Sequence, residues 1–416
     1  MSRDILISNS DNKISVLAYV PSWFEHYCEK GGGGWLRFKK IHELAPEANI
    51  NYHLVRFKLE LQRPLIVGVS LMFGSLVKAL FQSLKIIKHA KIHLVLSPNE
   101  IPQTIILAYL SSKITRRRFV VFLNSVPGYG QIDSFKFEGK LTSYPVLLKA
   151  MRHAGQSWAR TVLEAFVWYI AFSMFRSSET RILCLSPTVA SELSELNVKG
   201  RIIPIYPGNG IDYRGVPLVT LKADENRFDA IYATGNFHPQ KGIFEVVNIW
   251  VNVVKKNPGA KLAIAGMVHR TRPEVIDELN SLIRDLGLHL NVSIICDPFK
   301  GMTQKELWKE MKRSKIFLYP SRKDVWSLVI GEALACGLPV IAYNLPGINY
   351  AYGACPAVCL QNVGDVEGAA KTAIKLLSDD SLLRNLSHKA RQYAANHSWT
   401  HVVELERKAY LTILNN

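Results

Sequence analysis

Short apolar runs alternate with helical patterns along the whole chain, and this alternation constrains the fold more than any other feature. In the first half the runs cover residues 14–20, 52–57, 92–96, 119–123, 182–185 and 202–206. In the second half they cover residues 228–233, 261–265, 292–296, 315–319 and 340–343. Such runs, separated by helical stretches of roughly 10–20 residues, are typical of parallel sheets with helices on both faces. The sequence therefore predicts an α/β fold with two doubly wound, Rossmann-like sheets.

The length of the chain indicates two domains. A chain of 416 residues is long for a single hydrophobic core. Hydrophobic residues make up 48% of it and charged residues 20%, a composition typical of a folded globular protein. Glycine and asparagine mark a turn at residues 207–212. We therefore predict an N-terminal domain over residues 1–208 and a second domain from residue 209 onward.

Two acids stand eight residues apart at a predicted strand–loop–helix junction. Asp324 follows the apolar run 316–319, and Glu332 lies in the helical pattern 328–336, which ends at Gly337. Carboxylates placed in this way face the crevice where open α/β sheets bind ligands. Hydroxyl-rich ligands such as ribose and hexose suit carboxylate acceptors. The alternative for Glu332 is a solvent-facing helix residue.

Residues 319–344 resemble the signature of retaining GT-B glycosyltransferases of the large family 4 type. That signature reads roughly Pro-Ser-x-x-Glu-Gly-Phe-Gly-Leu-x-x-x-Glu-Ala-x-Ala-x-Gly-x-Pro-Val. The matching positions are Pro320, Ser321, Leu328, Glu332, Ala333, Ala335, Gly337, Pro339 and Val340. At three positions the chain departs from the signature: Asp324 replaces the first Glu, Trp326 the Phe, and Ser327 the second Gly.

The resemblance continues from about residue 180 to the end of the chain. It includes the helix start at 186–193, the Asn-Gly-Ile-Asp sequence at 209–212, and the His-Ser-Trp sequence at 397–399 before the last helix. The resemblance implies a GT-B fold, with two Rossmann-like domains facing a cleft. It also implies a C-terminal domain over residues 209–399 that binds a nucleotide sugar, and a closing helix over 400–416 that crosses back to the N-terminal domain.

A phosphate site is predicted at residues 234–242, between the first strand of the second domain and the helix 244–255. A glycine near a strand end and a lysine at a helix start can bind phosphate through backbone N–H groups and one positive charge. The family pattern Gly-Arg-x-x-x-x-Lys-Gly matches Gly235, Lys241 and Gly242. Asn236 stands where the family has its phosphate-binding arginine, so His238 or Arg270 are the candidates to replace it. The alternative for Lys241 is an ordinary solvated lysine.

The resemblance implies a role for each residue of the donor site. Glu332 would bind the ribose hydroxyls, and Asp324 would accept hydrogen bonds from the donor sugar. Lys241 and the main-chain N–H groups of Ser327 and Leu328 would bind phosphate. Asp324, Lys241 and Glu332 form the predicted catalytic set, and Gly235, Asn236 and His238 complete the donor site. No Asp-x-Asp motif stands at a strand end, so neither a metal nor a cofactor is expected, and the nucleotide sugar is the co-substrate.

The N-terminal domain is expected to bind the acceptor. Residues 30–43 read as a glycine loop, including Gly32, Gly33 and Gly34, that leads into a basic helix. This loop resembles the family's Gly-Gly loop, although a merely flexible turn is the alternative. Family members often carry a histidine after the strand that corresponds to 119–123. Here Asn124 stands at that place, and an asparagine cannot titrate.

The positive charge of the chain is concentrated in its first half. The net charge is +17, and residues 1–200 hold 25 Lys and Arg against 14 Asp and Glu, a net of +11. The amphipathic pattern 74–90 and the run Arg116–Arg118 suit an anionic membrane or a phosphorylated acceptor, although solvated basic faces are the alternative. Aromatic residues do not alternate with these charges as they do in single-strand nucleic-acid sites, so nucleic acid is not expected.

The remaining features indicate where the protein works. Six scattered cysteines are interpreted as free thiols in a reducing compartment. The N-terminus lacks a signal-peptide pattern, and the apolar run 165–175 is shorter than the roughly 20 residues that span a bilayer. We expect a cytoplasmic protein, with peripheral binding to the inner face of the membrane as an option.

Together these patterns predict transfer of a hexosyl group from a nucleotide sugar to a saccharide or lipid-linked saccharide. Retention of configuration follows from the resemblance alone. Two alternatives stay open: a nucleotide-sugar epimerase of the same fold, and a non-catalytic sugar- or lipid-binding partner subunit.

Overall fold

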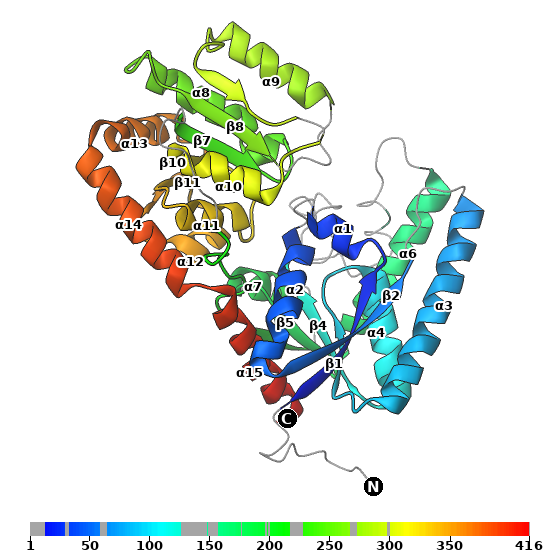
Figure 1. The fold of residues 1–416 in the computed structure, drawn as a ribbon. Coiled ribbons are helices and arrows are strands. Elements are labelled where there is room, and N and C mark those ends of the chain that lie inside the picture. The colour runs from blue at the N-terminus through cyan, green and yellow to red at the C-terminus, as the bar shows by residue number, and fades with distance from the viewer. Residues whose placement is uncertain are drawn as a thin grey trace. The chain divides into compact units, whose positions relative to one another are not determined.

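The computed structural model describes residues 13–29, 33–58, 65–125, 148, 157–175, 177–195, 198, 200–216, 228–266, 273–297 and 300–415. The chain divides into two compact units (Figure 1). The first contains Met1–Tyr27, Gly34–Gly208 and Thr400–Asn416. The second contains Asn209–Trp399 together with the short segment Cys28–Gly33. The predicted residues Gly32 and Arg270 lie outside the described ranges.

A six-stranded parallel sheet forms the centre of the N-terminal unit. Its strands are β1 (Ile14–Pro21), β2 (Ile50–Phe57), β3 (Leu94–Ser97), β4 (Arg118–Leu123), β5 (Arg181–Cys184) and β6 (Arg201–Pro204). Their order in the sheet is β2-β1-β3-β4-β5-β6, and the pairs are parallel. The chain starts at β1, adds β2 on one side and β3 to β6 on the other. The point where the winding reverses therefore lies between β1 and β3.

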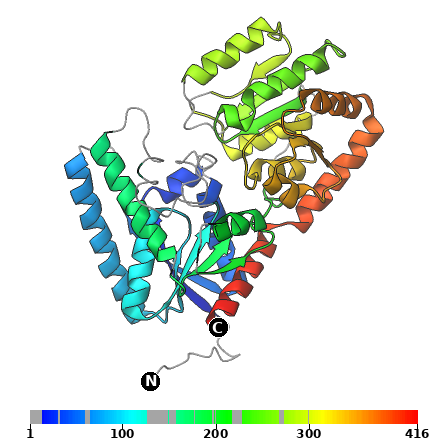
Figure 2. The ribbon, with the colours of Figure 1, turned by 180° about the vertical axis from the view of Figure 1, so that it is seen from behind.

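Helices cover both faces of this sheet. They are α1 (Phe24–Glu29), α2 (Gly33–Leu44), η1 (Ala45–Ala48), α3 (Leu65–His89), α4 (Pro102–Thr115), α6 (Trp158–Phe175), α7 (Pro187–Glu195) and α15 (Trp399–Asn415). Tyr109 of α4 packs edge-on against Phe119, whereas Arg37 of α2 stacks 3.5 Å over the ring of Phe122. Residues 119 and 122 point to opposite faces of β4 because side chains alternate along a strand. The layer of α3, α4 and α6 therefore lies opposite α2 (Figure 2).

The last helix packs on the N-terminal unit, as the predicted closing helix requires. Glu406 of α15 accepts a hydrogen bond from Arg37 at 2.8 Å, and each of these side chains is at most 2% exposed. Tyr52 of β2 and Tyr410 of α15 both donate to the other carboxylate oxygen of Glu406. Arg37 also donates to the main-chain oxygen of Gly208 at 2.8 Å, so one buried arginine joins α2, α15 and the last residue of the segment Gly34–Gly208.

A second six-stranded parallel sheet forms the centre of the C-terminal unit. Its strands are β7 (Phe228–Thr234), β8 (Leu262–Gly266), β9 (Val292–Ile294), β10 (Ser314–Tyr319), β11 (Val340–Tyr343) and β12 (Val358–Gln361). The order is β12-β11-β10-β7-β8-β9, again with parallel pairs. The winding reverses between β7 and β10. In sheets of this type the crevice at the carboxyl ends of such strands is the usual ligand site.

The helices of this unit lie in two layers. They are η4 (Pro239–Lys241), α8 (Ile243–Val254), α9 (Pro273–Asp285), α10 (Gln304–Lys312), α11 (Leu328–Ala335), α12 (Pro346–Tyr352), α13 (Val366–Ser378) and α14 (Asp380–Asn396). α8 contacts α9 and α13, whereas α11 contacts α10 and α14. The α/β prediction is confirmed, and every predicted apolar run contributes to a strand. The sequence reading missed β12, a short edge strand whose residues are all only partly buried.

All six cysteines lie in the described ranges, and none forms a disulfide bond, as predicted. Cys28, Cys184, Cys296, Cys336 and Cys355 are buried, and Cys359 is partly buried. Burial raises the pKa of the Cys296 thiol to about 11 and that of Cys184 to about 12, because the apolar surroundings disfavour a thiolate. These side chains therefore serve as small apolar core residues.

Candidate functional site

Two loops meet where the winding of the C-terminal sheet reverses. The first loop, residues 235–242, follows β7, and the second, residues 320–327, follows β10. The N–H of Arg322 donates to the main-chain oxygen of Gln240 at 2.9 Å, and the Ser321 hydroxyl donates to the same oxygen at 3.3 Å. Arg322 also pairs with Glu245 on α8. The two loops therefore form a single connected surface at the predicted ligand crevice.

Lys241 and Asp324 join these loops directly. The Nζ atom of Lys241 lies 3.0 Å from Asp324 Oδ2 and 3.0 Å from the main-chain oxygen of Lys323. Only 29% of the Lys241 side chain and 10% of the Asp324 side chain are exposed. Lys241 is thus not the freely solvated lysine of the alternative interpretation, because its ammonium group is held against the second loop.

Asp324 is held by three protein donors. Besides Lys241, the hydroxyl of Tyr319 donates to Oδ2 at 2.6 Å, and the N–H of Trp326 donates to Oδ1 at 3.2 Å. Burial, followed by the negative charge of Asp324, raises the pKa of Tyr319 well above its usual value, so the phenol stays protonated and donates. Asp324 therefore organises the second loop. Its role toward a donor sugar stays a prediction.

Gly242 allows the two loops to approach closely. Its φ angle is +81°, a conformation that strongly favours glycine. A Cβ atom at this position would lie 2.1 Å from the main-chain oxygen of Pro320. The backbone conformation and the close contact therefore explain why position 242 of the predicted phosphate motif is a glycine. It brings the start of α8 against the end of β10.

The second predicted acid is buried at the side of α11. Glu332 is 8% exposed, and its Oε1 atom accepts a hydrogen bond of 2.6 Å from Gln304, the first residue of α10. A solvent-facing position for Glu332 is therefore wrong. α11 begins with Leu328 after the N-cap residue Ser327, whose side chain does not cap the helix. Helix N-terminal N–H groups and the helix dipole favour an anion at such a position.

The other predicted donor residues lie on the first loop. Gly235 is exposed directly after β7, and a Cβ atom there would have nothing within 4 Å. Asn236 is partly buried. His238 caps η4, since its Nδ1 atom accepts a hydrogen bond of 3.2 Å from the N–H of Gln240. The structure thus brings together Lys241, Asp324 and the start of α11, with Gly235 and His238 on the same loop as Lys241.

Two of the predicted acceptor residues, Gly34 and Asn124, lie together in the N-terminal unit. Gly34 stands on α2, one residue after Gly33, and a Cβ atom at Gly34 would lie 2.7 Å from the amide nitrogen of Asn124. Asn124 donates from its backbone and its side chain to Glu100 Oε2, each at 3.4 Å. Ser125 donates to Glu100 Oε1 at 3.2 Å. Gly34 and Asn124 thus share one cluster with an acid, and Gly33 and Gly34 begin α2 rather than lying in the predicted loop.

Glu100 is a candidate residue that the sequence reading missed. It follows β3, next to the point where the winding of the N-terminal sheet reverses. Burial raises the pKa of its carboxyl group, while hydrogen bonds from Asn124 and Ser125 oppose the shift. A titratable group therefore stands beside the asparagine that cannot titrate. The rule that ligands meet the carboxyl ends of parallel strands was the available signal for Glu100. Gln304 and Tyr319 were also missed. Gln304 contacts Glu332, which is 28 residues away in sequence, whereas Tyr319 contacts Asp324, only five residues away.

Comparison with known proteins supports the interpretation of the C-terminal unit. Residues 221–395 match the sequence family described as glycosyl transferases group 1. The chain is 32% identical over 157 residues to the N-acetyl-alpha-D-glucosaminyl L-malate synthase of Bacillus anthracis. These aligned residues make up 38% of each of the two chains. The chain covers less than two thirds of the length of the curated relatives it matches.

Solved structures match over nearly the whole chain. The sucrose-phosphate synthase of Thermosynechococcus elongatus covers 97% of this chain and 100% of its own, with a TM-score of 0.64 and 16% identity. The Anabaena protein HepE, solved in complex with UDP-glucose, covers 96% of this chain and 99% of its own, with a TM-score of 0.63 and 15% identity. At these identities the likeness concerns the fold. The fold is the two-domain GT-B fold predicted from the sequence.

Proposed function

We propose that the protein is a glycosyltransferase that moves a hexosyl group from a nucleotide sugar to a saccharide or lipid-linked saccharide acceptor. We further propose that it retains the anomeric configuration and requires no metal. The observation that carries the proposal is the joining of the two loops at the β7–β10 crevice, which places Lys241, Asp324 and the start of α11 together. The family match over residues 221–395 and the UDP-glucose complex of HepE support this interpretation.

The proposed chemistry at this crevice is electrostatic. A nucleotide diphosphate leaves with additional negative charge, which the Lys241 ammonium group and the N–H groups at the start of α11 would stabilise. Both are already held in place by the protein, so little reorganisation is required during the reaction. Asp324 keeps Lys241 oriented through the 3.0 Å contact. Glu332 would accept hydrogen bonds from the ribose hydroxyls, which suits a buried carboxylate.

The acceptor is assigned to the N-terminal unit. The cluster of Glu100, Asn124 and Ser125 beside Gly34 offers carboxylate, amide and hydroxyl groups at the carboxyl ends of β3 and β4. Such groups suit the hydroxyls of a saccharide. The raised pKa of Glu100 also fits a group that takes part in proton transfer. The positive charge of the N-terminal half favours an anionic or membrane-held acceptor.

A ligand panel tests the donor site. Thermal unfolding is measured with UDP, GDP and ADP and with their common sugar conjugates. A nucleotide that binds the folded state raises the unfolding temperature, by an amount that grows with the logarithm of its concentration relative to its Kd. We expect one base to stabilise the protein clearly and its sugar conjugate to support transfer in the presence of EDTA. If no ligand of the panel raised the unfolding temperature, the result would argue against a nucleotide-sugar site in the C-terminal unit.

Product analysis separates the alternatives. A transferase consumes the donor in the presence of an acceptor, and nuclear magnetic resonance of the product reports whether configuration is retained. An epimerase would convert the donor without any acceptor. A non-catalytic subunit would bind the nucleotide sugar without turnover on any acceptor. We also propose that the protein is located in the cytoplasm, and cell fractionation tests this location.

A further inference from the structure

The outer side of α3 carries apolar residues that the fold does not bury. Ala79, Ser83 and Ile87 face the protein and are buried. Phe73, Val77 and Phe81 follow at intervals of four residues on another side of the helix, which places them in one stripe. They are 67%, 37% and 67% exposed. An 18-residue window within Ser70–His89 has a mean hydropathy of 1.3, and 17% of that window is buried.

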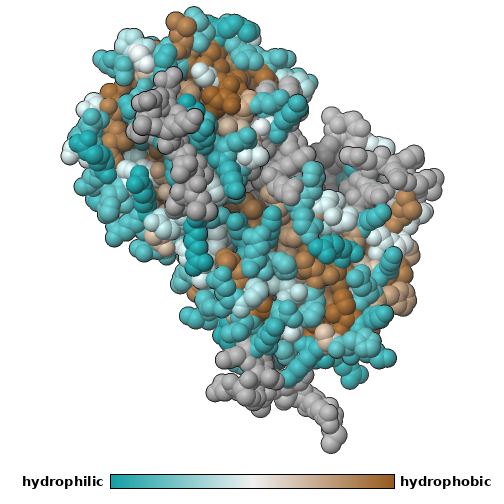
Figure 3. Space-filling model, viewed as in Figure 1, coloured by the Kyte–Doolittle hydropathy of each residue, from teal (hydrophilic) through white to brown (hydrophobic). Residues whose placement is uncertain are grey.

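The neighbouring helices of the same layer also carry exposed apolar residues. α4 contacts both α3 and α6. On α4, Leu110 and Ile114 are 40% and 58% exposed, and on α6, Phe166 and Tyr169 are 50% and 42% exposed. Figures 1 and 2 show these three helices on the same side of the N-terminal sheet. Hydrophobic residues reach the surface along the edge that α3 forms (Figure 3). We call the residues Phe73, Val77, Phe81, Leu110, Ile114, Phe166 and Tyr169 the apolar face.

Positive charges stand beside the apolar face, most of them at one end of it. Lys78, Lys85 and Lys88 are exposed on α3, the last two in its final turns. The C-terminal end of α4 lies near that of α3. The two helices lead into β3 and β4, which are neighbouring parallel strands, so both helices end at the same edge of the sheet. Lys113 lies in the last turn of α4, and Arg116 and Arg117 follow it. The long side chains of lysine and arginine can reach past an apolar surface and keep their charges in a polar layer.

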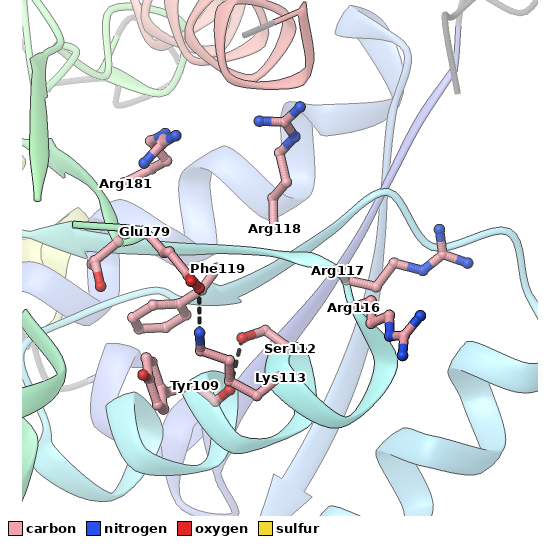
Figure 4. Close-up of a pocket in the computed structure, with 10 residues that line it drawn as sticks. Tyr109, Ser112, Lys113, Arg116, Arg117, Arg118, Phe119, Glu179 and Arg181 are labelled. Carbon is pink, nitrogen blue, oxygen red and sulfur yellow. Dashed lines mark hydrogen bonds and ion pairs between the residues drawn. The ribbon is translucent and has the colours of Figure 1, made fainter. Parts of the chain in front are cut away.

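The end of α4 also borders a basic pocket of about 490 Å³ (Figure 4). Arginines at positions 116, 117, 118 and 181 line it together with Lys113, and Glu179 is the acid among its lining residues. Glu179 pairs with Lys113. Arg117 has a buried Nε atom that makes no hydrogen bond to a described residue. The helix dipole of α4 favours a positive charge at this end. Four arginines with one acid provide more positive charge than the helix dipole alone would favour. This excess of positive charge suits a phosphate group.

We propose that the apolar face docks on an anionic lipid bilayer, with the phenyl rings of α3 in the interface and the basic pocket on a lipid phosphate. Charge complementarity identifies this occupant, since the described rim is cationic and a bilayer of anionic lipids offers apolar chains beneath phosphate groups. An amphipathic helix with aromatic residues on one side and lysines beside them is typical of interfacial binding. The proposal goes beyond the proposed transferase function and does not depend on it.

Vesicle flotation of the full chain tests the docking surface. The protein is mixed with vesicles of phosphatidylcholine alone or of phosphatidylcholine with phosphatidylglycerol. We expect binding only to the anionic vesicles, and weaker binding at high salt. The double variant Phe73→Ser/Phe81→Ser should reduce the partition coefficient about tenfold or more, because each ring loses most of its interfacial contact. The double variant Lys85→Glu/Lys88→Glu should reduce it by a similar factor.

Matched controls lie on the C-terminal unit. Leu290 is 70% exposed there, so Leu290→Ser removes an equally exposed apolar side chain. Lys255→Glu/Lys256→Glu reverses two exposed charges at the end of α8. Both controls should bind vesicles as the parent does. The unfolding temperature of each variant is measured as well, since the replaced side chains are exposed and the fold should remain intact.

Three outcomes would overturn the proposal. The parent chain fails to bind anionic vesicles, or the α3 variants and the controls lose binding equally. The third outcome is that the parent does not bind vesicles but self-associates in sedimentation, and that Phe73→Ser/Phe81→Ser abolishes this self-association. The apolar face would then be a contact between two copies of the chain. Arg117→Gln tests the pocket separately. Unchanged binding of that variant to phosphatidylglycerol vesicles would remove the pocket from the docking surface, whereas weaker binding supports its part.

Discussion

The Nζ atom of Lys241 lies 3.0 Å from Oδ2 of Asp324, although 83 residues separate the two in sequence. The contact joins the loop after β7 to the loop after β10, the two central strands of the C-terminal sheet. Each residue was predicted to serve the donor, one through phosphate and one through the sugar. Their contact means that a change at one alters the position of the other, so substitutions at these sites should not be additive.

Lys241→Ala should abolish most transfer and leave the fold intact. The substitution removes a charge-assisted contact to phosphate, which contributes roughly 1.5–3 kcal/mol. We therefore expect kcat/KM to fall about tenfold to more than a hundredfold. Asp324 keeps Tyr319 and the N–H of Trp326 as donors, so the unfolding temperature should change by only a few degrees. Lys255→Ala, at an exposed position, is the control. Full activity of Lys241→Ala would contradict the assignment of the phosphate site.

Glu332→Gln should weaken nucleotide binding through the ribose. The parent should prefer a nucleotide over its 2′,3′-dideoxy analogue, because the buried carboxylate accepts hydrogen bonds from the ribose hydroxyls. In Glu332→Gln this preference should fall about tenfold, as measured by titration calorimetry with both ligands. Gln304→Ala frees the carboxylate from its 2.6 Å contact and should have the smaller effect. An unchanged preference in Glu332→Gln would place the ribose elsewhere.

Gly242→Ala and Gly235→Ala should separate structure from binding. At position 242 the φ angle of +81° and a Cβ atom 2.1 Å from the oxygen of Pro320 predict a loss of about 2 kcal/mol or more in unfolding free energy. At position 235 a Cβ atom has nothing within 4 Å, so stability should change by less than about 0.5 kcal/mol. If the bound donor contacts the backbone of Gly235, Gly235→Ala should nonetheless bind the nucleotide more weakly. Equal stability of the two variants in urea unfolding would contradict this account of Gly242.

Glu406→Gln and Arg37→Met should both destabilise the N-terminal unit strongly. The pair is at most 2% exposed, and removal of one charge leaves the other buried without its partner, which costs about 3–5 kcal/mol. The double variant Arg37→Met/Glu406→Gln should recover part of this loss, because it leaves neither charge buried. Thermal unfolding of the three variants measures the coupling. Additive losses in the double variant would show that the ion pair itself contributes little.

Glu100→Gln should change the pH dependence of stability. The folded pKa of Glu100 is raised by burial, so the native state binds more protons than the unfolded state between the unfolded and folded pKa values. This group therefore makes the parent less stable as pH rises from about 4.3 through its folded pKa. The variant cannot titrate and should lack that decline, while its transfer activity falls if Glu100 serves the acceptor. Identical pH profiles of stability for parent and variant would contradict the buried carboxyl group.

The local pattern of the chain was sufficient to predict most of the elements. Alternating apolar runs located eleven of the twelve strands found in the described residues, because a parallel strand that is buried on both faces is usually a continuous apolar run. The edge strand β12 was missed, since its partly buried residues carry a weaker signal. The same pattern located Asp324 and Gly235 at strand ends, and the resemblance supplied the closing helix.

What the sequence by itself determined is therefore the fold class and the positions of the loops that form the proposed donor site. The tertiary structure decided which of these positions meet. Strand order places β10 beside β7, which joins Lys241 to Asp324, and packing of α15 brings Glu406 to Arg37 across 369 residues. It also decided that Glu332 is buried and that Glu100 stands beside Asn124. Periodicity reports how one element presents its own residues to the core, whereas the neighbours of that element depend on long-range packing that no local pattern contains.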